Sequence, residues 1–298
     1  MDRNRLIGTI TPRGAASVVG AVRLSAVVVD ELARLTDRDR YLLDLLFDHG
    51  TLTTEQVAAL AFGSVGRARI RLGTLRERGI LDRFRHYQRP GSQSWRWTLG
   101  PVGAAIIAAG RDQPAPRPAT VREATARLAA SPTLPHLVSV NGFFVALAAH
   151  ARTNDSARLL RWWNEARSRQ TCGNLVRPDG HGVWHSGGRV VPFWLEMDLG
   201  TEVLRRVAGK LTGYAHLAGT RWGYPVLIWL PTTAREANLH HTLTGTGVPD
   251  GLTVATATHE QAAGTVGPAG PVWRVAGHTG RVALADIPVT APGVGCGR

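Results

Sequence analysis

Four side chains in the second half of the sequence have the types and spacing of a metal-dependent phosphodiesterase centre. Asp179 lies in a strand-like run over 174–184, and Glu196 and Asp198 alternate along a second run over 190–199. Alternate residues of a strand share a face, so the last two should point the same way. Carboxylates among apolar neighbours are costly unless a cation meets them, and hard ions prefer oxygen ligands. We therefore expect Asp179, Glu196 and Asp198 to hold Mg²⁺ or Mn²⁺.

The use of lysine directs attention to the helix expected after these strands. Of the 35 basic residues, Lys210 is the only lysine. A helix over about 201–218, capped by Thr201, would place Lys210 in one row with Tyr214. From there the ammonium could lean over the carboxylates and stabilise the charge that develops when the metal activates water. Glu165 is expected as a further acid of this catalytic group.

A structural role is the alternative explanation of the same acids. Glu196 and Asp198 would then pair with nearby arginines, and Asp179 would cap a turn before Gly180. Geometry separates the two explanations. Carboxylates of Asp179 and Glu196 too far apart to share one ion, or arginine side chains in the site, would argue against an enzyme.

A sheet with covering helices is needed to bring these residues together. Helical patterns cover about 120–130 and 136–151, strand-like runs follow, and 225–230 resembles a buried strand. The order αβββαβ predicts an α/β or α+β domain with a mixed sheet over 120–245. Residues 246–298 are rich in Gly, Pro and Thr, and the sequence gives no firm structure for them.

The first half of the chain has the pattern of a winged helix-turn-helix. After a segment over 1–35 without a firm assignment, three helical stretches follow one another up to Gly79. The expected N-caps are Thr36, Thr53 or Thr54, and Ser64. Two strand-like runs over 80–88 and 94–99 then form a hairpin. Three helices and a hairpin are the order of a winged helix-turn-helix, which we assign to 36–111. The Pro-rich residues 112–119 are expected to be a linker.

Positive charge is concentrated on the third helix and the hairpin. The net charge is +13, and nine arginines between Arg67 and Arg96 face only two acids. Arginine forks reach guanine edges or phosphates, and hairpin arginines follow the DNA backbone. A solvated basic face, or a winged helix used for protein contacts, is the alternative. The residues predicted to contact DNA are Arg67, Arg71, Thr74, Arg78, Arg83, Arg85 and Arg89.

Composition bounds the remaining classes of protein. The chain has 298 residues, of which 44% are apolar and 19% charged, as in folded domains. Two cysteines are too few for a disulfide framework, and no apolar run approaches the length of a membrane span. We therefore expect a soluble, cytoplasmic protein of about two domains, with double-stranded DNA as partner and no membrane.

Several of these motifs carry a family resemblance. The run 177–180 (Arg-Pro-Asp-Gly) followed by 196–198 (Glu-Met-Asp) resembles the PD-(D/E)XK nuclease superfamily. With 35–39 (Leu-Thr-Asp-Arg-Asp) and 134–137 (Leu-Pro-His-Leu) before them, the order resembles the replication-relaxation family of actinobacterial plasmids and integrated mobile elements. The resemblance extends over about 35–245.

The resemblance implies a restriction-endonuclease-like domain over 120–245 that cuts DNA with Mg²⁺. Asp179 matches the Asp of the motif and Glu196 its second acid. The third position is Asp198 where the motif has Lys, and Lys210 would substitute for it from the helix.

Two functions of different classes follow for a protein of plasmid replication or mobilisation. One is a Mg²⁺-dependent DNA endonuclease or nickase. The other is a non-catalytic DNA-binding replication accessory or transcriptional regulator that keeps a degenerate nuclease fold. Both classes commonly dimerise, so a homodimer is compatible with either.

Overall fold

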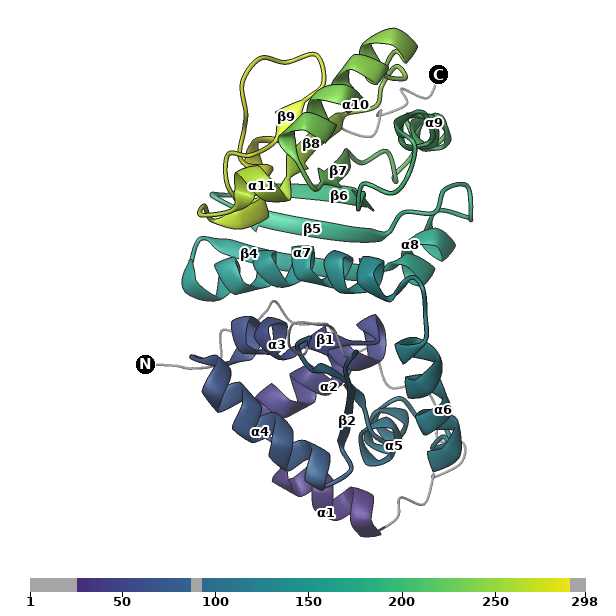
Figure 1. The fold of residues 1–298 in the computed structure, drawn as a ribbon, viewed down its shortest axis with the longest axis vertical. Coiled ribbons are helices and arrows are strands. Elements are labelled where there is room, and N and C mark those ends of the chain that lie inside the picture. The colour runs from purple at the N-terminus through teal and green to yellow at the C-terminus, as the bar shows by residue number, and fades with distance from the viewer. Residues whose placement is uncertain (1–25, 87–92, 290–298) are drawn as a thin grey trace, which may run out of the picture. The chain divides into compact units, whose positions relative to one another are not determined.

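The computed structural model describes residues 26–86 and 93–289. These residues divide into two compact units, an N-terminal unit up to Gly142 and a C-terminal unit from Phe143 onward. The described residues contain eleven α-helices and two β-sheets, a mixed α+β fold (Figure 1).

The N-terminal unit combines helices with a small antiparallel sheet. Its helices are α1 (Ala26–Arg34), α2 (Asp37–His49), α3 (Thr54–Ala61), α4 (Val65–Glu77), α5 (Pro101–Gly110) and α6 (Pro118–Ala129). Its strands are β1 (Leu52–Thr53), β2 (Leu81–Phe84) and β3 (Arg96–Leu99), arranged in the order β1-β3-β2. The hairpin of β2 and β3 was predicted from the sequence, whereas β1 and α1 were not.

The helix starts of this unit follow from the predicted caps. The Thr36 side chain accepts a hydrogen bond from the Asp39 backbone, and Thr53 and Ser64 cap α3 and α4 in the same way. On α4, Ala68, Leu72 and Leu75 are all fully buried and form the core face of the helix. The opposite side of α4 is therefore left to solvent.

The boundary between the units differs from the predicted linker over 112–119. Helix α6 contacts α5 and β2, and the boundary falls inside the long helix α7 (Leu134–Thr153). In the first part of α7, Asn141 donates hydrogen bonds to the backbone oxygens of His49 and Thr51. The proline content of 112–119 could not predict these contacts, because they form between segments that are far apart in the sequence.

The C-terminal unit is built on a six-stranded mixed sheet. Its strands are β4 (Ala157–Asn164), β5 (Gly180–Ser186), β6 (Arg189–Met197), β7 (Val226–Leu230), β8 (Val254–Thr258) and β9 (Arg274–Val275), and they lie in sequence order. Strands β6, β7 and β8 are parallel to one another, and the other neighbours are antiparallel. The helical segments are α8 (Glu165–Thr171), α9 (Leu204–Ala215), α10 (Thr233–Thr246), α11 (His259–Ala262), η1 (Gly267–Ala269) and η2 (Leu284–Asp286).

Helices cover both faces of this sheet, and β6 has buried residues on both. Phe193 contacts Phe143 and Phe144 of α7, at ring centroid distances of 6.1 Å and 6.0 Å. Its neighbour Trp194 packs instead with Leu211 of α9 in a second core cluster. Figure 1 shows α7 on one side of β4–β6 and α9 and α10 on the other. The predicted alternation of β6 is therefore confirmed.

Three expectations for this unit are wrong in detail. Residues 174–179 are not part of a strand, because β5 begins only at Gly180. Helix α9 begins at Leu204 after Val203, without a side-chain cap, so Thr201 does not cap it. The C-terminal extension supplies β8 and β9 to the sheet and is therefore part of the domain predicted to end at 245. These two strands are short and are flanked by Gly and Pro residues, so the sequence pattern did not indicate them.

Helix α7 also has the length and hydropathy of a membrane-spanning helix, the only described helix that does. Its Phe143, Phe144 and Leu147 side chains are buried within the C-terminal unit. These contacts are typical of a core helix.

Candidate functional site

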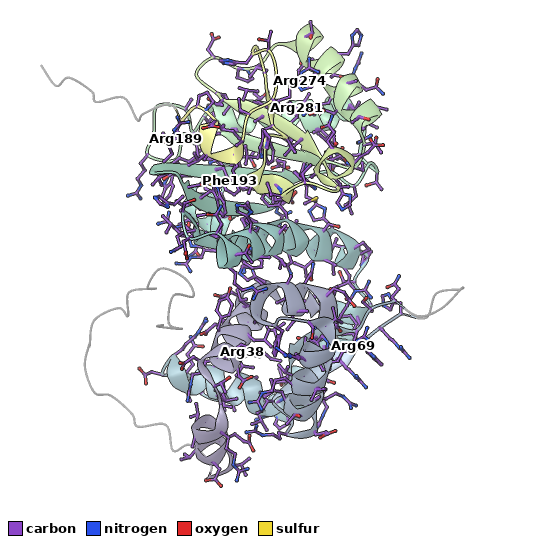
Figure 2. All side chains as sticks on the ribbon, turned by 90° about the vertical axis from the view of Figure 1, so that its left-hand side faces the viewer. Arg38, Arg69, Arg189, Phe193, Arg274 and Arg281 are labelled. Atoms are coloured by element: carbon purple, nitrogen blue, oxygen red, sulfur yellow. The ribbon has the colours of Figure 1, made fainter. Side chains whose placement is uncertain are left out.

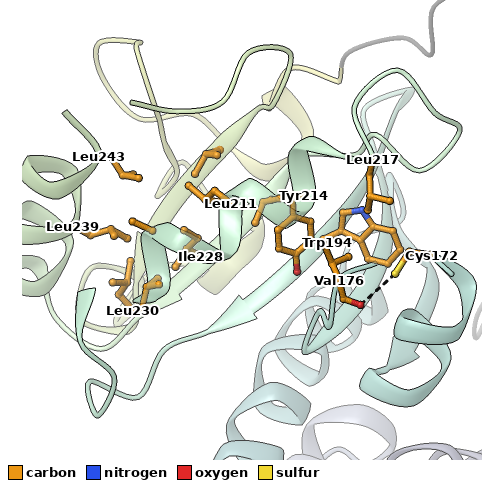
Figure 3. Packing of buried hydrophobic residues seen from close by; sticks show 14 residues of the cluster. Cys172, Val176, Trp194, Leu211, Tyr214, Leu217, Ile228, Leu230, Leu239 and Leu243 are labelled. Atoms are coloured by element: carbon orange, nitrogen blue, oxygen red, sulfur yellow. Dashed lines mark hydrogen bonds between the residues drawn. The ribbon is translucent and has the colours of Figure 1, made fainter. Parts of the chain in front are cut away.

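Glu196, Lys210 and Tyr214 meet on the face of the sheet that α9 covers. Glu196, near the end of β6, is 4% exposed. The Lys210 ammonium donates to Glu196 Oε2 at 3.0 Å, and the Tyr214 hydroxyl donates to Oε1 at 2.5 Å. Tyr214 also packs with Trp194 and Leu211 in the core cluster of Figure 3, which fixes its position. The predicted row of Lys210 and Tyr214 thus reaches the predicted acid.

Asp179 lies directly before β5, next to the end of β6. Its backbone N–H donates to the Leu195 carbonyl, and its Oδ2 accepts from the Met197 backbone N–H at 2.7 Å. Glu202 adds another carboxylate, 3.2 Å from the Lys210 ammonium. We call Asp179, Glu196, Glu202, Lys210 and Tyr214 the acid cluster. Its three carboxylates share one ammonium.

Burial and the neighbouring charges shift the pKa values of Glu196 and Lys210. Burial raises the pKa of Glu196 to about 7, and the charge of Asp179 adds to the increase, although Lys210 and Tyr214 oppose it. Burial alone would lower the pKa of Lys210, but Glu196, Asp179 and Glu202 together raise it above its ordinary value. Glu196 is therefore a carboxyl that takes up a proton near neutral pH.

Asp198 does not join the acid cluster. Arg235 of α10 binds both of its carboxylate oxygens, and Arg235 Nη2 also donates to the Glu202 carbonyl oxygen at 2.5 Å. Asp198 therefore follows the alternative of pairing with an arginine. Glu165 lies on α8, where it is half exposed and pairs with Arg177 at 2.8 Å. The sequence predicted both acids to belong to the catalytic group. Spacing along the chain does not show which arginines pair with them.

The residues that lie together offer few ligands to a metal ion. No group of three or more His, Cys, Asp and Glu side chains in 26–86 and 93–289 is arranged to hold one. Asp179 and Glu196 remain as a pair of interacting carboxylates. Mg²⁺ is commonly bound through one or two carboxylates together with substrate phosphates. The pair is thus compatible with an ion that arrives with a phosphate ligand.

In the N-terminal unit, some of the predicted DNA-contacting residues of α4 are exposed, and others form ion pairs within the fold. Arg71 forms a bidentate pair with the buried Asp39 of α2, and Arg78 pairs with Glu31 of α1. The Thr74 hydroxyl donates to the Ile70 carbonyl on its own helix. Arg67 is exposed, and no acidic side chain among the described residues pairs with it. Arg71 and Arg78 therefore stabilise the fold through ion pairs.

The hairpin arginines stack on a tryptophan. The guanidinium groups of Arg83 and Arg85 lie 3.9 Å and 4.2 Å from the ring centroid of Trp95. Trp97 is buried and donates to Thr54, whereas Trp95 is half-buried. The remaining predicted residue, Arg89, lies outside the described residues.

Two exposed arginines of α4, Arg69 and Arg76, were not among the predicted DNA contacts. Arg69 lines a hollow of about 390 Å³ with Arg83, Arg85 and Trp95, and the charge of Arg76 acts on Arg83. Arg69 is visible on this unit in Figure 2. A helical wheel could have predicted their exposure, because it places Arg69 and Arg76 on the flank of α4 opposite to Arg67.

Comparison with known proteins gives one match. The replication-relaxation family model matches residues 43–226, more than half of the chain. The chain belongs to the replication-relaxation family. The match spans most of the N-terminal unit and the C-terminal unit through the start of β7, including Asp179, Glu196 and Lys210. No curated protein and no solved structure matches the chain.

Proposed function

We propose that the protein binds duplex DNA in the replication or mobilisation of a plasmid or other mobile element. In this proposal the N-terminal unit is a winged helix-turn-helix, with α4 as recognition helix and the β2–β3 hairpin as wing. The observation that carries it is the distribution of arginines on α4. Family membership supports the replication context.

The outer side of α4 has the shape and charge of a helix that enters a DNA groove. Opposite the buried core face lie Gly66, Ile70 and Gly73, and Ile70 is 75% exposed. A Cβ atom added at Gly73 would meet nothing within 4 Å. Exposed arginines lie on both flanks of this ridge, Arg67 on one and Arg69 on the other. A narrow ridge fits between the strands of a major groove, and flanking arginines reach the phosphates.

Duplex binding is tested by fluorescence anisotropy with a labelled double-stranded oligonucleotide. Arg69→Ala and Arg83→Ala should each weaken binding about three- to tenfold, because each removes a phosphate contact. The matched control is Arg122→Ala, an exposed arginine on α6 of the same unit. Equal affinity of all three variants and wild type, or no binding to any duplex, would refute the proposal.

A second candidate, phosphodiester hydrolysis, is favoured by the acid cluster alone. Asp179 directly before β5, the buried Glu196 on β6 and Lys210 from α9 resemble the two acids and the lysine of a PD-(D/E)XK nuclease. The lysine here comes from a helix, and Asp198 occupies the position where the motif has lysine. In this candidate Asp179 and Glu196 would hold Mg²⁺ or Mn²⁺ together with a DNA phosphate, and the ion would polarise the phosphate and lower the pKa of a bound water. Lys210 keeps its proton because the surrounding carboxylates raise its pKa. It can therefore stabilise negative charge on the phosphate.

Nicking of supercoiled plasmid with Mg²⁺ or Mn²⁺ tests this candidate. Asp179→Ala and Lys210→Ala should abolish nicking, whereas Glu165→Gln should leave it unchanged, because Glu165 pairs with Arg177 away from the cluster. Failure of the wild type to nick cognate origin DNA, with duplex binding intact, would leave the non-catalytic DNA-binding function.

A further inference from the structure

A row of aromatic rings crosses the sheet beside the acid cluster. Trp163 on β4, His181 on β5 and Trp194 on β6 are direct neighbours in the strand register. The His181 ring lies 4.8 Å from that of Trp163 and 4.7 Å from that of Trp194. Tyr224 stacks on His181 at 5.3 Å, and Trp222 contacts Tyr224 edge-on at 5.9 Å.

The outer members of this row are accessible. Trp194 and His181 are fully buried, whereas Trp163, Trp222 and Tyr224 are half-buried. We call these three half-buried rings the aromatic surface. Packing of a core explains the two buried rings. It does not explain three large rings left in contact with solvent.

Arginines stack on the same rings. The guanidinium groups of Arg161 and Arg167 lie 4.6 Å and 4.9 Å from the centroid of Trp163. Arg221 lies 4.9 Å from the centroid of Trp222. Arg167 and Arg221 are exposed, and no described acidic side chain forms an ion pair with either. The aromatic surface is therefore bordered by cations that are available to an anionic ligand.

His181 gives an independent indication of a binding site. Its Nδ1 donates to the Phe193 carbonyl at 2.8 Å, while its Nε2 is buried without a hydrogen-bond partner among the described residues. A buried polar atom without a partner is rare in folded proteins and is often found where a ligand or function requires it. This one lies among the rings that support the aromatic surface.

The strand register sets the aromatic surface next to the acid cluster. Asp179 directly precedes β5, two residues before His181, and its backbone N–H donates to Leu195 of β6. On β6 itself, Trp194 is two residues before Glu196. Residues two apart on a strand share a face. The same face of the sheet thus presents rings with arginines in one row and carboxylates with a lysine in the next.

We propose that the aromatic surface binds unpaired bases of single-stranded DNA, with Arg167 and Arg221 on the phosphates. Aromatic rings combined with arginines are the means by which proteins hold single strands, because every base offers a π-face. Bases of a duplex are stacked on one another and cannot offer that face. The inference rests on the proposed function, because its ligand is DNA whose strands have been separated or cut. It differs from that function in that it assigns single-stranded DNA to the C-terminal unit.

The experiment compares four labelled probes of one length by anisotropy: oligo(dT), oligo(rU), an abasic strand with the deoxyribose backbone, and a DNA duplex. Wild type should bind oligo(dT) at least tenfold more tightly than the abasic strand, because stacking of bases contributes most of the affinity. Trp163→Ala should weaken oligo(dT) binding about tenfold and leave duplex binding within about twofold. Trp163→Phe should restore most of the affinity, since it keeps a ring.

A second variant keeps the test decisive should Trp163→Ala disturb the fold. Exchanging both exposed arginines, Arg167 and Arg221, for Ala should weaken binding to oligo(dT) several-fold. The matched control is Arg274→Ala, an exposed arginine on the edge strand β9 at the other end of the sheet (Figure 2). Equal binding of oligo(dT) and the abasic strand, or tighter binding of oligo(rU), would overturn the proposal. Binding of the duplex probe is measured separately. A protein that does not bind the duplex would therefore contradict the α4 interface only.

Discussion

The hydrogen bonds and ion pairs of individual side chains determine which predicted site residues lie close together. Spacing alone grouped Asp179, Glu196, Asp198 and Lys210, since alternation on a strand and a helix row are local properties. The structure brings Asp179, Glu196 and Lys210 together and separates Asp198, which Arg235 holds. An arginine 37 residues away cannot be assigned to one carboxylate by sequence alone. Local geometry therefore brings three of the four side chains together, and their catalytic role stays a prediction.

The buried histidine gives a residue-scale prediction of pH dependence. Burial lowers the pKa of His181 to about 3, and the charge of Arg161 adds to the decrease. The folded protein thus keeps the ring neutral, while the unfolded chain takes up a proton below its ordinary pKa of about 6.5. Stability is fully present above pH 6.5 and falls as the pH falls toward 3. By pH 5.5 this histidine should reduce the free energy of unfolding by about 1.4 kcal/mol.

Urea denaturation at pH 7.5 and pH 5.5 measures this effect. His181→Asn should lose about 1.4 kcal/mol less than wild type between the two pH values. Only the difference is diagnostic, because His49 is also buried with a lowered pKa and because Glu196, with its raised pKa, changes stability in the opposite direction. An identical loss in both proteins would contradict a neutral, buried His181.

Helices and strands followed from local sequence wherever caps and periodicity were strong. Thr36, Thr53 and Ser64 cap their helices as predicted, because N-cap chemistry needs only a few neighbouring residues. The strands β1, β8 and β9 were missed. Each is two to five residues long and depends on partners far along the chain, which a single sequence does not show.

Helix α4 yields an element-scale prediction through Gly73 on its outer ridge. A Cβ added there meets nothing within 4 Å, and the ridge faces solvent, so Gly73→Leu should fold normally and gain about 0.5–1 kcal/mol from helix propensity. The same side chain would stand between α4 and the groove floor, so duplex DNA binding should weaken at least about tenfold. Anisotropy and thermal unfolding measure the two effects on one protein.

Gly209→Leu is the matched control, because Gly209 is an exposed helix glycine of α9 with nothing within 4 Å. It should leave duplex affinity unchanged. Unchanged affinity of Gly73→Leu as well would mean that the outer ridge of α4 does not enter DNA.

At the scale of the whole molecule, net charge indicated a polyanionic partner but not where it binds. The two units carry different cationic surfaces, unpaired arginines around α4 in one and arginines stacked on Trp163 and Trp222 in the other. The division at Gly142 and Phe143 was not predicted, since it lies within a continuous helix. Salt dependence can separate a localised interface from diffuse attraction by a net charge of +13.

Within the described part of α4 and its hairpin, the exposed or stacked arginines without acidic partners are Arg67, Arg69, Arg76, Arg83 and Arg85. If each neutralises one phosphate, the logarithm of the duplex association constant should fall with the logarithm of salt with a slope of about −4 to −5. Arg85→Ala should reduce this slope by about one, and Arg274→Ala in the other unit should not change it. Diffuse attraction would instead give both variants the same slope, because each removes one charge from the total. Anisotropy titrations between about 50 and 200 mM salt therefore distinguish an interface on α4 and its hairpin from a generally basic surface.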